Sequence, residues 1–279
     1  MTSHWADELA FAVELAKRAG QLLLDSYERL ERIDYKSKRD VVTDADYASE
    51  RVVIDAIKAR YPDDAILAEE SGEHAGVLRD DGSHNGRTWV IDPLDGTVNY
   101  ANGIPYYCVS IGLVVDDRPS AGVVYDPARD DCYTATADGP ACLDGEVIEA
   151  SSKETLSDYV VSLAVIGSGG LTRERRIAPQ IRIHRRMGSA ALSLAYVGNG
   201  RFDAFVQNGG LSPWDVAAAG LIAERGGATV TDVLGGPWWK RWNPKARGAR
   251  TSIVAAPAVQ HGPIIEMLAS LRTQVRTRR

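Results

Sequence analysis

The segment Asp-Pro-Leu-Asp-Gly-Thr at residues 92–97 carries the residue types best suited to chemistry in this 279-residue chain. It follows a short apolar run at residues 88–91, which predicts a buried strand that stops at Asp92, so that Asp92 and Asp95 lie at its carboxyl end. Gly96 permits a tight turn, and the N–H groups from there onward would open a helix whose N-terminus binds an anion. Carboxylates gathered at one place repel each other and usually require a cation, and hard oxygen ligands select magnesium or calcium rather than zinc. The segment therefore predicts a divalent-cation site beside an anion site.

Three rival interpretations of this segment can be weighed on the residues themselves. Asp-Gly is a common hairpin-turn pair, so a turn without chemistry stays open. An EF-hand loop would need an acid or amide at Leu94 and a glutamate at Gly103, and both are absent. A haloacid-dehalogenase-type phosphatase uses an Asp-x-Asp pair, whereas two residues separate Asp92 from Asp95. The last two interpretations are therefore rejected.

Further acidic residues stand at the ends of predicted elements. Glu69 and Glu70 end a second apolar run at residues 65–68, Asp46 stands near the start of a predicted helix, and Asp215 stands near the start of another. Taken singly, each is typical of a solvated surface pair or a helix cap. Their shared position at element ends favours one common acidic site.

Composition narrows the class of protein. The net charge of −6 argues against nucleic acid as the main partner, because a phosphate backbone selects a basic surface. The odd number of cysteines, without a Cys-x-x-Cys pair, fits a reducing compartment with free thiols. Neither a signal-peptide pattern nor an apolar run of about 18 residues is visible. We therefore expect a cytoplasmic protein that binds neither nucleic acid nor a membrane.

The periodicity of apolar residues predicts the elements around the acidic segments. Helical spacing predicts one helix over residues 5–30 and a second that starts near Thr43 or Asp44 and ends before Pro62. Alternating apolar residues at 107–137 predict a meander of antiparallel strands.

The pattern of predicted elements changes near Ser151. Beyond it, strands and helices alternate, which indicates an α/β arrangement. We expect residues 1–150 to form an α+β half with an antiparallel sheet and most of the metal ligands. Residues 151–279 would form an α/β half that contributes Asp215 and the substrate contacts.

Ordered motifs along nearly the whole chain resemble the inositol monophosphatase family. The motifs are Lys36 with Asp-Val-Val-Thr-Asp-Ala-Asp at residues 40–46, Ala-Glu-Glu-Ser at 68–71, Trp-Val-Ile-Asp-Pro-Leu-Asp-Gly-Thr-Val-Asn at 89–99, Arg-Arg-Met-Gly-Ser-Ala-Ala at 185–191 and Pro-Trp-Asp-Val-Ala-Ala at 213–218. The resemblance implies a layered αβαβα sandwich with the site between its two halves. Members of the family are commonly dimers, so a homodimer is expected.

The same resemblance implies a set of magnesium ligands. Glu69, Asp92 and the backbone carbonyl of Leu94 would hold one ion, and Asp92, Asp95 and Asp215 would hold a second. A third, weaker ion near Glu69 and Glu70 brings the expected number of ions to two or three. One ion would lower the pKa of a water and another would stabilise the leaving oxygen.

The catalytic residues implied by the resemblance are Thr97, Asp46 and Glu70. The Thr97 hydroxyl would accept a hydrogen bond from the attacking water, or pass its proton toward Asp46 as the base partner. Glu70 would lie beside the third ion. The N–H groups of Gly96 and Thr97 would bind phosphate oxygens. Water would attack in line, without a phosphoenzyme.

Substrate contacts are implied at two further places. Lys36 would lie near the edge of the site, and Gly188, Ser189 and Ala190 would approach the alcohol part of the substrate. A solvated lysine and plain helix packing by small residues remain the alternatives.

One position departs from the family pattern. Inositol-selective members carry a glutamate seven residues before the aspartate of the Trp-Asp pair. This chain has one extra residue between the matched Asp203 and Asp215, so two positions could correspond to that glutamate. Counted back from Asp215 the position is Asn208, and counted forward from Asp203 it is Gln207, so the residue is an amide in both cases. An amide still hydrogen-bonds a polyol, but it binds a cationic substrate such as histidinol phosphate less well than a carboxylate does.

The expected activity is magnesium-dependent hydrolysis of a small phosphate monoester, inositol 1-phosphate or a similar polyol phosphate, with lithium sensitivity. Fructose 1,6-bisphosphate is the runner-up substrate, and histidinol phosphate is a further alternative. The 3′-phosphoadenosine nucleotides rank last, because no long insertion near the site is visible. A metal-binding regulatory dimer without turnover is the alternative from another class. Trp238, Trp239 and Trp242 fit either loop packing or a partner surface.

Overall fold

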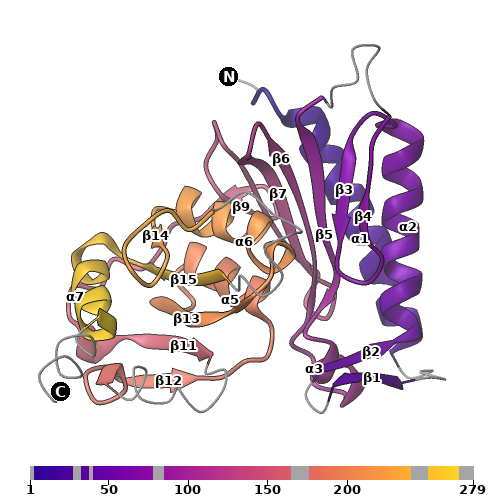
Figure 1. Ribbon diagram of the computed structural model, residues 1–279. Coiled ribbons are helices and arrows are strands. Elements are labelled where there is room, and N and C mark those ends of the chain that lie inside the picture. Colours follow the sequence, from indigo (N-terminus) through magenta and orange to yellow (C-terminus); the bar gives the residue numbers. More distant parts are fainter. Residues whose placement is uncertain are drawn as a thin grey trace, which may run out of the picture.

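The computed structural model describes residues 3–27, 33–37, 40–77, 85–164, 176–239 and 251–269, without the side chains of residues 33–42 and 164. The described elements stack in five layers, in the order helix, sheet, helix, sheet, helix (Figure 1). Each layer buries an apolar face against the next one. The αβαβα sandwich expected from the sequence is confirmed.

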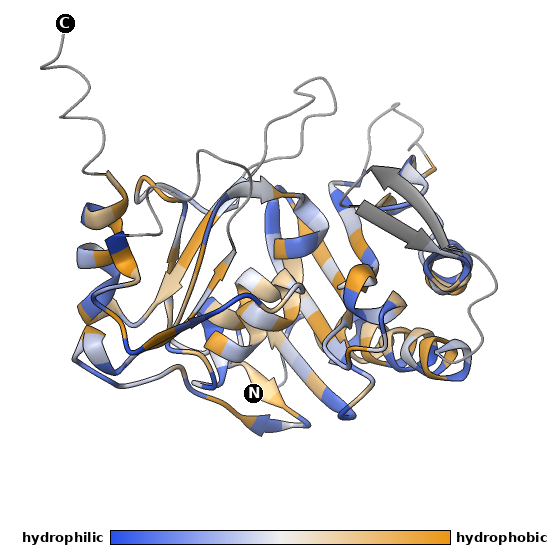
Figure 2. Cartoon of the chain, turned by 90° about the horizontal axis from the view of Figure 1, so that it is seen from below, coloured by the Kyte–Doolittle hydropathy of each residue, from blue (hydrophilic) through white to orange (hydrophobic). Residues whose placement is uncertain are grey.

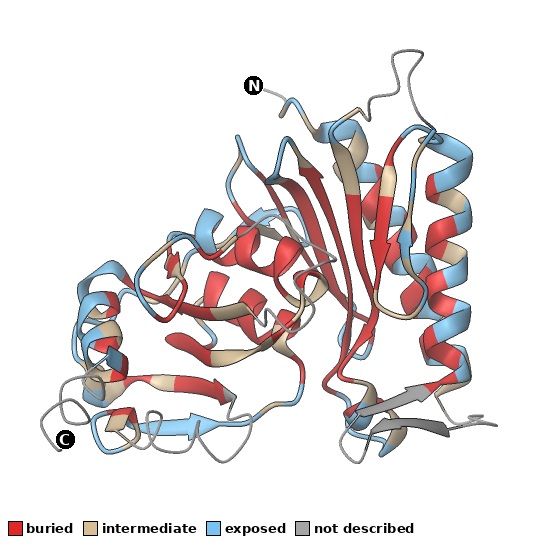
Figure 3. Cartoon of the chain, in the orientation of Figure 1, coloured by how far each residue is buried: buried red, intermediate tan, exposed pale blue. Residues whose placement is uncertain are grey.

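The first layer consists of α1 (Ala6–Ser26) and α2 (Asp44–Arg60). Their apolar residues lie on the side that faces the large sheet, and Figure 3 shows the outward side of α2 exposed. Thr43 is the N-cap of α2 and forms a capping box with Asp46, which explains where the helix begins. The start predicted near Thr43 and the end predicted before Pro62 are confirmed.

The second layer is an eight-stranded sheet in the order β10-β9-β8-β7-β6-β5-β3-β4. Neighbouring strands pair antiparallel except β3 and β5, which are parallel. The predicted meander is confirmed as β6, β7 and β8. The strands are β3 (Ala65–Ala68), β4 (Gly72–His74), β5 (Arg87–Asp95), β6 (Cys108–Val115), β7 (Arg118–Asp126), β8 (Asp131–Thr136), β9 (Cys142–Leu143) and β10 (Glu146–Val147).

The third layer, α5 (Ala190–Gly198) and α6 (Pro213–Arg225), is almost entirely buried because a sheet covers it on each side (Figure 3). The fourth is a five-stranded sheet in the order β12-β11-β13-β15-β14, and α7 (Ala258–Ala269) covers its outer face. Figure 2 shows hydrophobic segments along the strands of both sheets. The strands are β11 (Val160–Ala164), β12 (Ile183–Arg185), β13 (Ala204–Leu211), β14 (Thr229–Thr231) and β15 (Thr251–Ala256).

Three short elements complete the described fold. The hairpin of β1 (Ile33–Ser37) and β2 (Asp40–Thr43) lies beside α3 (Thr97–Ala101) at one end of the large sheet (Figure 1), and η1 (Leu156–Asp158) precedes β11. The eight-stranded sheet uses only residues before 150 and the five-stranded sheet only residues after it. The division of the chain into two halves at that point stays a prediction. Among the described residues, no helix is both long and apolar enough to span a bilayer.

Candidate metal and phosphate site

A β-bulge explains the spacing of the two aspartates on β5. The sequence predicted that the strand stops at Asp92, but it continues to Asp95, which corrects that prediction. Asp92 pairs with Ser110 and Asp95 pairs with Cys108, so three steps on β5 match two on β6. Pro93 lies in this interval and offers no N–H to the ladder, which favours a bulge there. Residues three apart on a regular strand face opposite sides, and the extra residue turns both aspartates to the same side.

The start of α6 brings a third carboxylate to the same place. Side-chain oxygens of Asp92, Asp95 and Asp215 all lie within 4.8 Å of one another. The fold holds one oxygen of each carboxylate through hydrogen bonds. The donors are the Leu94 N–H to Asp92 (3.1 Å), the Ser189 hydroxyl and the Ala191 N–H to Asp95 (2.6 Å each), and the Ser212 N–H to Asp215 (2.6 Å).

Burial raises the pKa values of all three carboxylates, and repulsion between charges raises those of Asp92 and Asp215 further. Burial is the largest cause for Asp92, whose pKa lies well above its usual range, followed by the charges of Glu69, Asp95 and Asp215. Burial is also the first cause of the raised pKa of Asp95 and of Asp215. Oxygen-only donors that repel one another in a buried place fit a hard divalent cation, because the cation removes the repulsion.

Glu69 and Glu70 follow β3 and lie at the same edge of the sheet. The Glu69 N–H donates to the Ile91 carbonyl at 3.2 Å, which ties the residue to β5. Its charge contributes to the raised pKa of Asp92, so the two carboxylates are neighbours. The Glu70 N–H donates to a carboxylate oxygen of Glu50 on α2 at 2.8 Å. Glu69 therefore lies beside the aspartate cluster, and the backbone of Glu70 is held against α2.

Thr97 opens α3 next to the cluster. Gly96, its N-cap, has a φ of 103°, and a Cβ there would lie 3.0 Å from the Tyr106 carbonyl oxygen, so glycine is required. The Thr97 hydroxyl lies 3.0 Å from Asp46 Oδ1 and 3.0 Å from the Leu94 carbonyl oxygen. A hydroxyl has one proton to donate and two lone pairs, so Thr97 can still accept a hydrogen bond. The predicted pair of Thr97 and Asp46 is in direct contact.

A cavity of about 250 Å³ adjoins Asp95 and Asp215. The predicted substrate residues Gly188, Ser189, Ala190 and Gln207 line it, together with Ser162, Met187, Ser193, Phe205 and Leu211. Asn208 lies on β13, half-buried, and is not among the lining residues. Of the two amides that the sequence offered, Gln207 is the one that faces the cavity.

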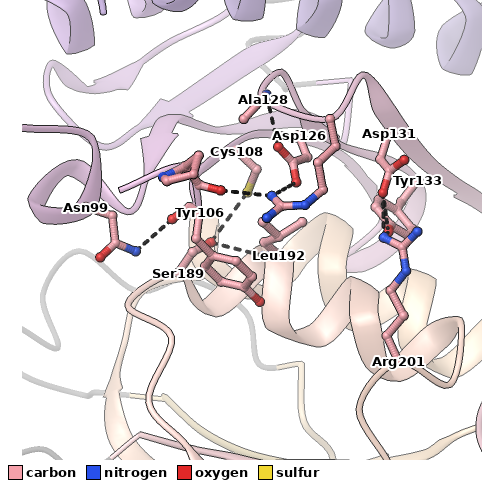
Figure 4. A network of polar contacts seen from close by, with 12 residues as sticks. Asn99, Tyr106, Cys108, Asp126, Ala128, Asp131, Tyr133, Ser189, Leu192 and Arg201 are labelled. Atoms are coloured by element: carbon pink, nitrogen blue, oxygen red, sulfur yellow. Dashed lines mark hydrogen bonds and ion pairs between the residues drawn. The ribbon is translucent and has the colours of Figure 1, made fainter. Parts of the chain in front are cut away.

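The Ser189 hydroxyl has a structural task. It donates to Asp95 and accepts the Leu192 N–H at 3.3 Å, so it caps α5 while it holds a carboxylate of the cluster. Figure 4 shows Ser189 between α5 and Cys108 of β6. A contact of this hydroxyl with substrate stays a prediction.

A model of the inositol monophosphatase family matches residues 5–275 of the chain. The chain belongs to this family. Among curated relatives, the Nus factor SuhB of Escherichia coli K12 is 37% identical over 236 residues, which cover 82% of this chain and 86% of that protein. The Nus factor SuhB of Pasteurella multocida is 36% identical over 241 residues, with 82% and 86% covered.

Solved structures of the same family share the fold. The IMPase of Thermotoga maritima superposes with a TM-score of 0.83 at 30% identity, covering 96% of this chain and 99% of that one. The inositol monophosphatase of Anabaena superposes with a TM-score of 0.80 at 33% identity, covering 96% and 97%. These likenesses extend over both sheets.

Within this inositol monophosphatase family fold, the sequence analysis missed two residues that connect site segments. The Asn99 amide donates to the Tyr106 carbonyl at 2.7 Å (Figure 4). It also donates to the Met187 carbonyl at 2.7 Å, and so ties α3 to the segment that carries Gly188. Glu50 holds the Glu70 N–H. The helical spacing of Glu50 from Asp46 was a signal that could have found it. The side chain of Lys36 lies outside the described residues, so its predicted role stays a prediction.

Proposed function

We propose that this family member hydrolyses a small phosphate monoester with magnesium, and that inositol 1-phosphate or a similar polyol phosphate is its substrate. The observation that carries the proposal is the convergence of Asp92, Asp95 and Asp215 within 4.8 Å, beside a cavity of about 250 Å³. A cluster of carboxylates serves cation binding, and the adjoining cavity offers room for an alcohol group. Family membership supports the same class of reaction.

The proposed ligands of two magnesium ions are the three aspartates, Glu69 and the Leu94 carbonyl, with a third ion near Glu69 and Glu70. When bound, the ions offset the charge of the phosphate and make water more acidic. The Leu94 carbonyl oxygen lies 3.0 Å from the Thr97 hydroxyl oxygen, and a carbonyl oxygen has two lone pairs, so it can bind a cation there. All of these donors are oxygens, which suits magnesium.

The Thr97 hydroxyl and Asp46 are the proposed proton-handling pair. Asp46 Oδ2 accepts the Thr43 N–H at 2.8 Å and the Thr43 hydroxyl at 2.6 Å, so the carboxylate cannot rotate freely. Its Oδ1 faces Thr97, whose lone pairs orient an attacking water while its proton points to Asp46. Glu70 is the proposed second acidic group at the water. The Gly96 and Thr97 N–H groups are the proposed phosphate donors.

The cavity supports a polyol as the alcohol part. Gln207 is 5% exposed and offers an amide that donates to or accepts from hydroxyl groups, and Ser162 and Ser193 add two hydroxyls to the same lining. Gly188 and Ala190 line the same cavity without a polar side chain. Fructose 1,6-bisphosphate remains the runner-up and histidinol phosphate the next candidate, because the lining carries no group that excludes them outright.

Phosphate release from a substrate panel, with magnesium and with a chelator, tests the proposal. The panel holds inositol 1-phosphate, fructose 1,6-bisphosphate, histidinol phosphate and 3′-phosphoadenosine 5′-phosphate. We expect magnesium-dependent release that is fastest with inositol 1-phosphate, and an Asp95→Asn variant is the inactive control. Release that survives chelation, or release only from the nucleotide, would contradict the proposal.

A second candidate function comes from the curated relatives, which are called Nus factors. That name favours a role in a macromolecular assembly, with or without turnover. Absence of phosphate release across the whole panel, from a protein that binds magnesium, would favour this candidate.

We also propose that the chain is a cytoplasmic homodimer. All three cysteines are unpaired, as in proteins of a reducing compartment. Val98 and Ile104, on and after α3, are 46% and 48% exposed and supply apolar surface for self-association. Sedimentation equilibrium should give twice the 30.2 kDa chain mass, and a monomer at micromolar concentration would contradict the dimer.

A further inference from the structure

The inward face of α2 carries three polar residues where a helix packed on a sheet normally carries apolar ones. Ser49 and Glu50 follow Asp46 by three and four positions, so both lie on the same face of the helix as Asp46. Asp46, Ser49 and Glu50 are 0%, 0% and 3% exposed, respectively. Burying polar and charged groups costs free energy unless they are hydrogen-bonded, so their partners decide what they do.

Each of the three side chains holds a different segment of the site. Asp46 accepts the Thr97 hydroxyl at 3.0 Å. The Ser49 hydroxyl donates to the Pro93 carbonyl, in the bulge between Asp92 and Asp95, at 2.9 Å. One helix face therefore contacts both the proposed phosphate-binding turn and the bulge that aligns two aspartates.

Glu50 holds the third segment through two bonds. Its Oε2 accepts the Glu70 N–H at 2.8 Å, and its Oε1 accepts the Ser71 N–H at 2.9 Å. These are the first residues after Glu69, where the chain turns from β3 into β4. A carboxylate that accepts two adjacent backbone N–H groups fixes the direction in which the preceding side chain points.

A purely stabilising role does not explain this choice of residues. Buried ionic groups are often replaceable by apolar residues without loss of stability, so a charge kept at 3% exposure has its value in placing particular atoms. Glu50 places the backbone N–H groups next to Glu69, and the Ser49 hydroxyl places the bulge next to Asp92. Partners behind metal ligands typically change metal affinity 10–100-fold when they are removed.

We propose that Ser49 and Glu50 are positioning residues, which set the distance between the Glu69–Glu70 turn and the Asp92–Asp95 bulge and thereby set the affinity of the site for magnesium. The inference rests on the metal site of the proposed function. It assigns to one helix face a task that spans two separate segments of the site.

The test compares Glu50→Gln with Asp55→Asn, the same acid-to-amide change on the outer face of the same helix. The Asp55 side chain is 69% exposed and pairs with Arg51 on the same helix, so it is a matched control. Magnesium binding is measured by calorimetry without substrate, and amide hydrogen exchange is measured in the chelated protein. For Glu50→Gln we expect the magnesium affinity to fall by about tenfold or more. Faster hydrogen exchange should be confined to the Glu70 and Ser71 amides. Asp55→Asn should match the wild type in both.

Two results would overturn the inference. One is wild-type magnesium affinity in Glu50→Gln, and the other is faster exchange spread evenly over the molecule, which would indicate general destabilisation. If Glu50→Gln does not fold, Glu50→Asp keeps the charge but is too short to reach both amides, and it must show the same local pattern. A wild-type chain that binds no magnesium would instead contradict the proposed function, so the two failures are distinguishable.

Discussion

The two sides of the candidate site are built in different ways. The side formed by the large sheet and α2 presents charged groups, and side chains of α2 hold two of its segments: Asp46 accepts the Thr97 hydroxyl, and Glu50 accepts the Glu70 N–H. The side formed by α5 and β13 presents small residues and an amide around a cavity. The first arrangement suits a cation and phosphate, which are common to all candidate substrates. The second suits the alcohol part, in which the candidates differ.

One residue crosses this division, and it shows how the two sides are joined. Asp215 comes from the later part of the chain, yet its oxygen lies within 4.8 Å of those of Asp92 and Asp95. In the opposite direction, Asp95 on β5 accepts bonds from Ser189 and Ala191 at the start of α5. The cluster can therefore assemble only when both sheets are in place.

The largest effect is expected from Asp92→Asn, which removes the central carboxylate of the charged side. Phosphate release should fall by about 10³-fold or more, because a preorganised charge at the reacting group is lost. The chelated variant should melt about 3 °C higher than the wild type, because repulsion among buried carboxylates is relieved. Phosphate assays and calorimetric melting check both parts. If Asp92→Asn kept its phosphatase activity, or melted at a lower temperature than the wild type in chelator, the assignment of the cluster as a cation site would be contradicted.

A smaller effect is expected from Ser189→Ala, which lies where the two sides meet. The free energy of unfolding should fall by ~1 kcal/mol, because the variant lacks the hydroxyl that caps the N-terminus of α5. The variant should also bind magnesium several-fold more weakly, because Asp95 loses a donor.

Ser193→Ala is the matched control for this prediction, because its hydroxyl donates to the Ser189 carbonyl at 2.6 Å and does not contact Asp95. Denaturant melts and magnesium titrations should separate the two variants. Equal magnesium affinities would show that the Ser189 hydroxyl acts on helix stability alone.

The smallest effect is expected from Gln207→Glu, which changes only the cavity side. A carboxylate there should raise kcat/KM for histidinol phosphate relative to inositol 1-phosphate by about tenfold, ~1.4 kcal/mol, because it attracts the substrate's ammonium group. Magnesium dependence should stay as in the wild type. A change in magnesium dependence, with the ratio of kcat/KM for the two substrates unchanged, would contradict the assignment of substrate choice to the cavity side and magnesium binding to the charged side.

Much of the fold and of the charged side was predictable from sequence. Thr43 with Asp46 and Ser212 with Asp215 are capping patterns that fix helix starts through local hydrogen bonds. The apolar periods of α2 and of the meander reflect burial of one helix face and of alternating strand positions. The inositol monophosphatase family was recognisable because its motifs are contiguous in sequence.

What only the tertiary structure decided depends on contacts between distant segments. The strand end predicted at Asp92 was too early, because the apolar run turns acidic there, whereas pairing with β6 carries β5 through a bulge to Asp95. The tasks of Ser49, Glu50, Asn99 and Ser189 were hidden, since each bonds to a group far away in the chain. Local propensity places a residue on a helix or strand, but the partner of a buried polar group is chosen by packing.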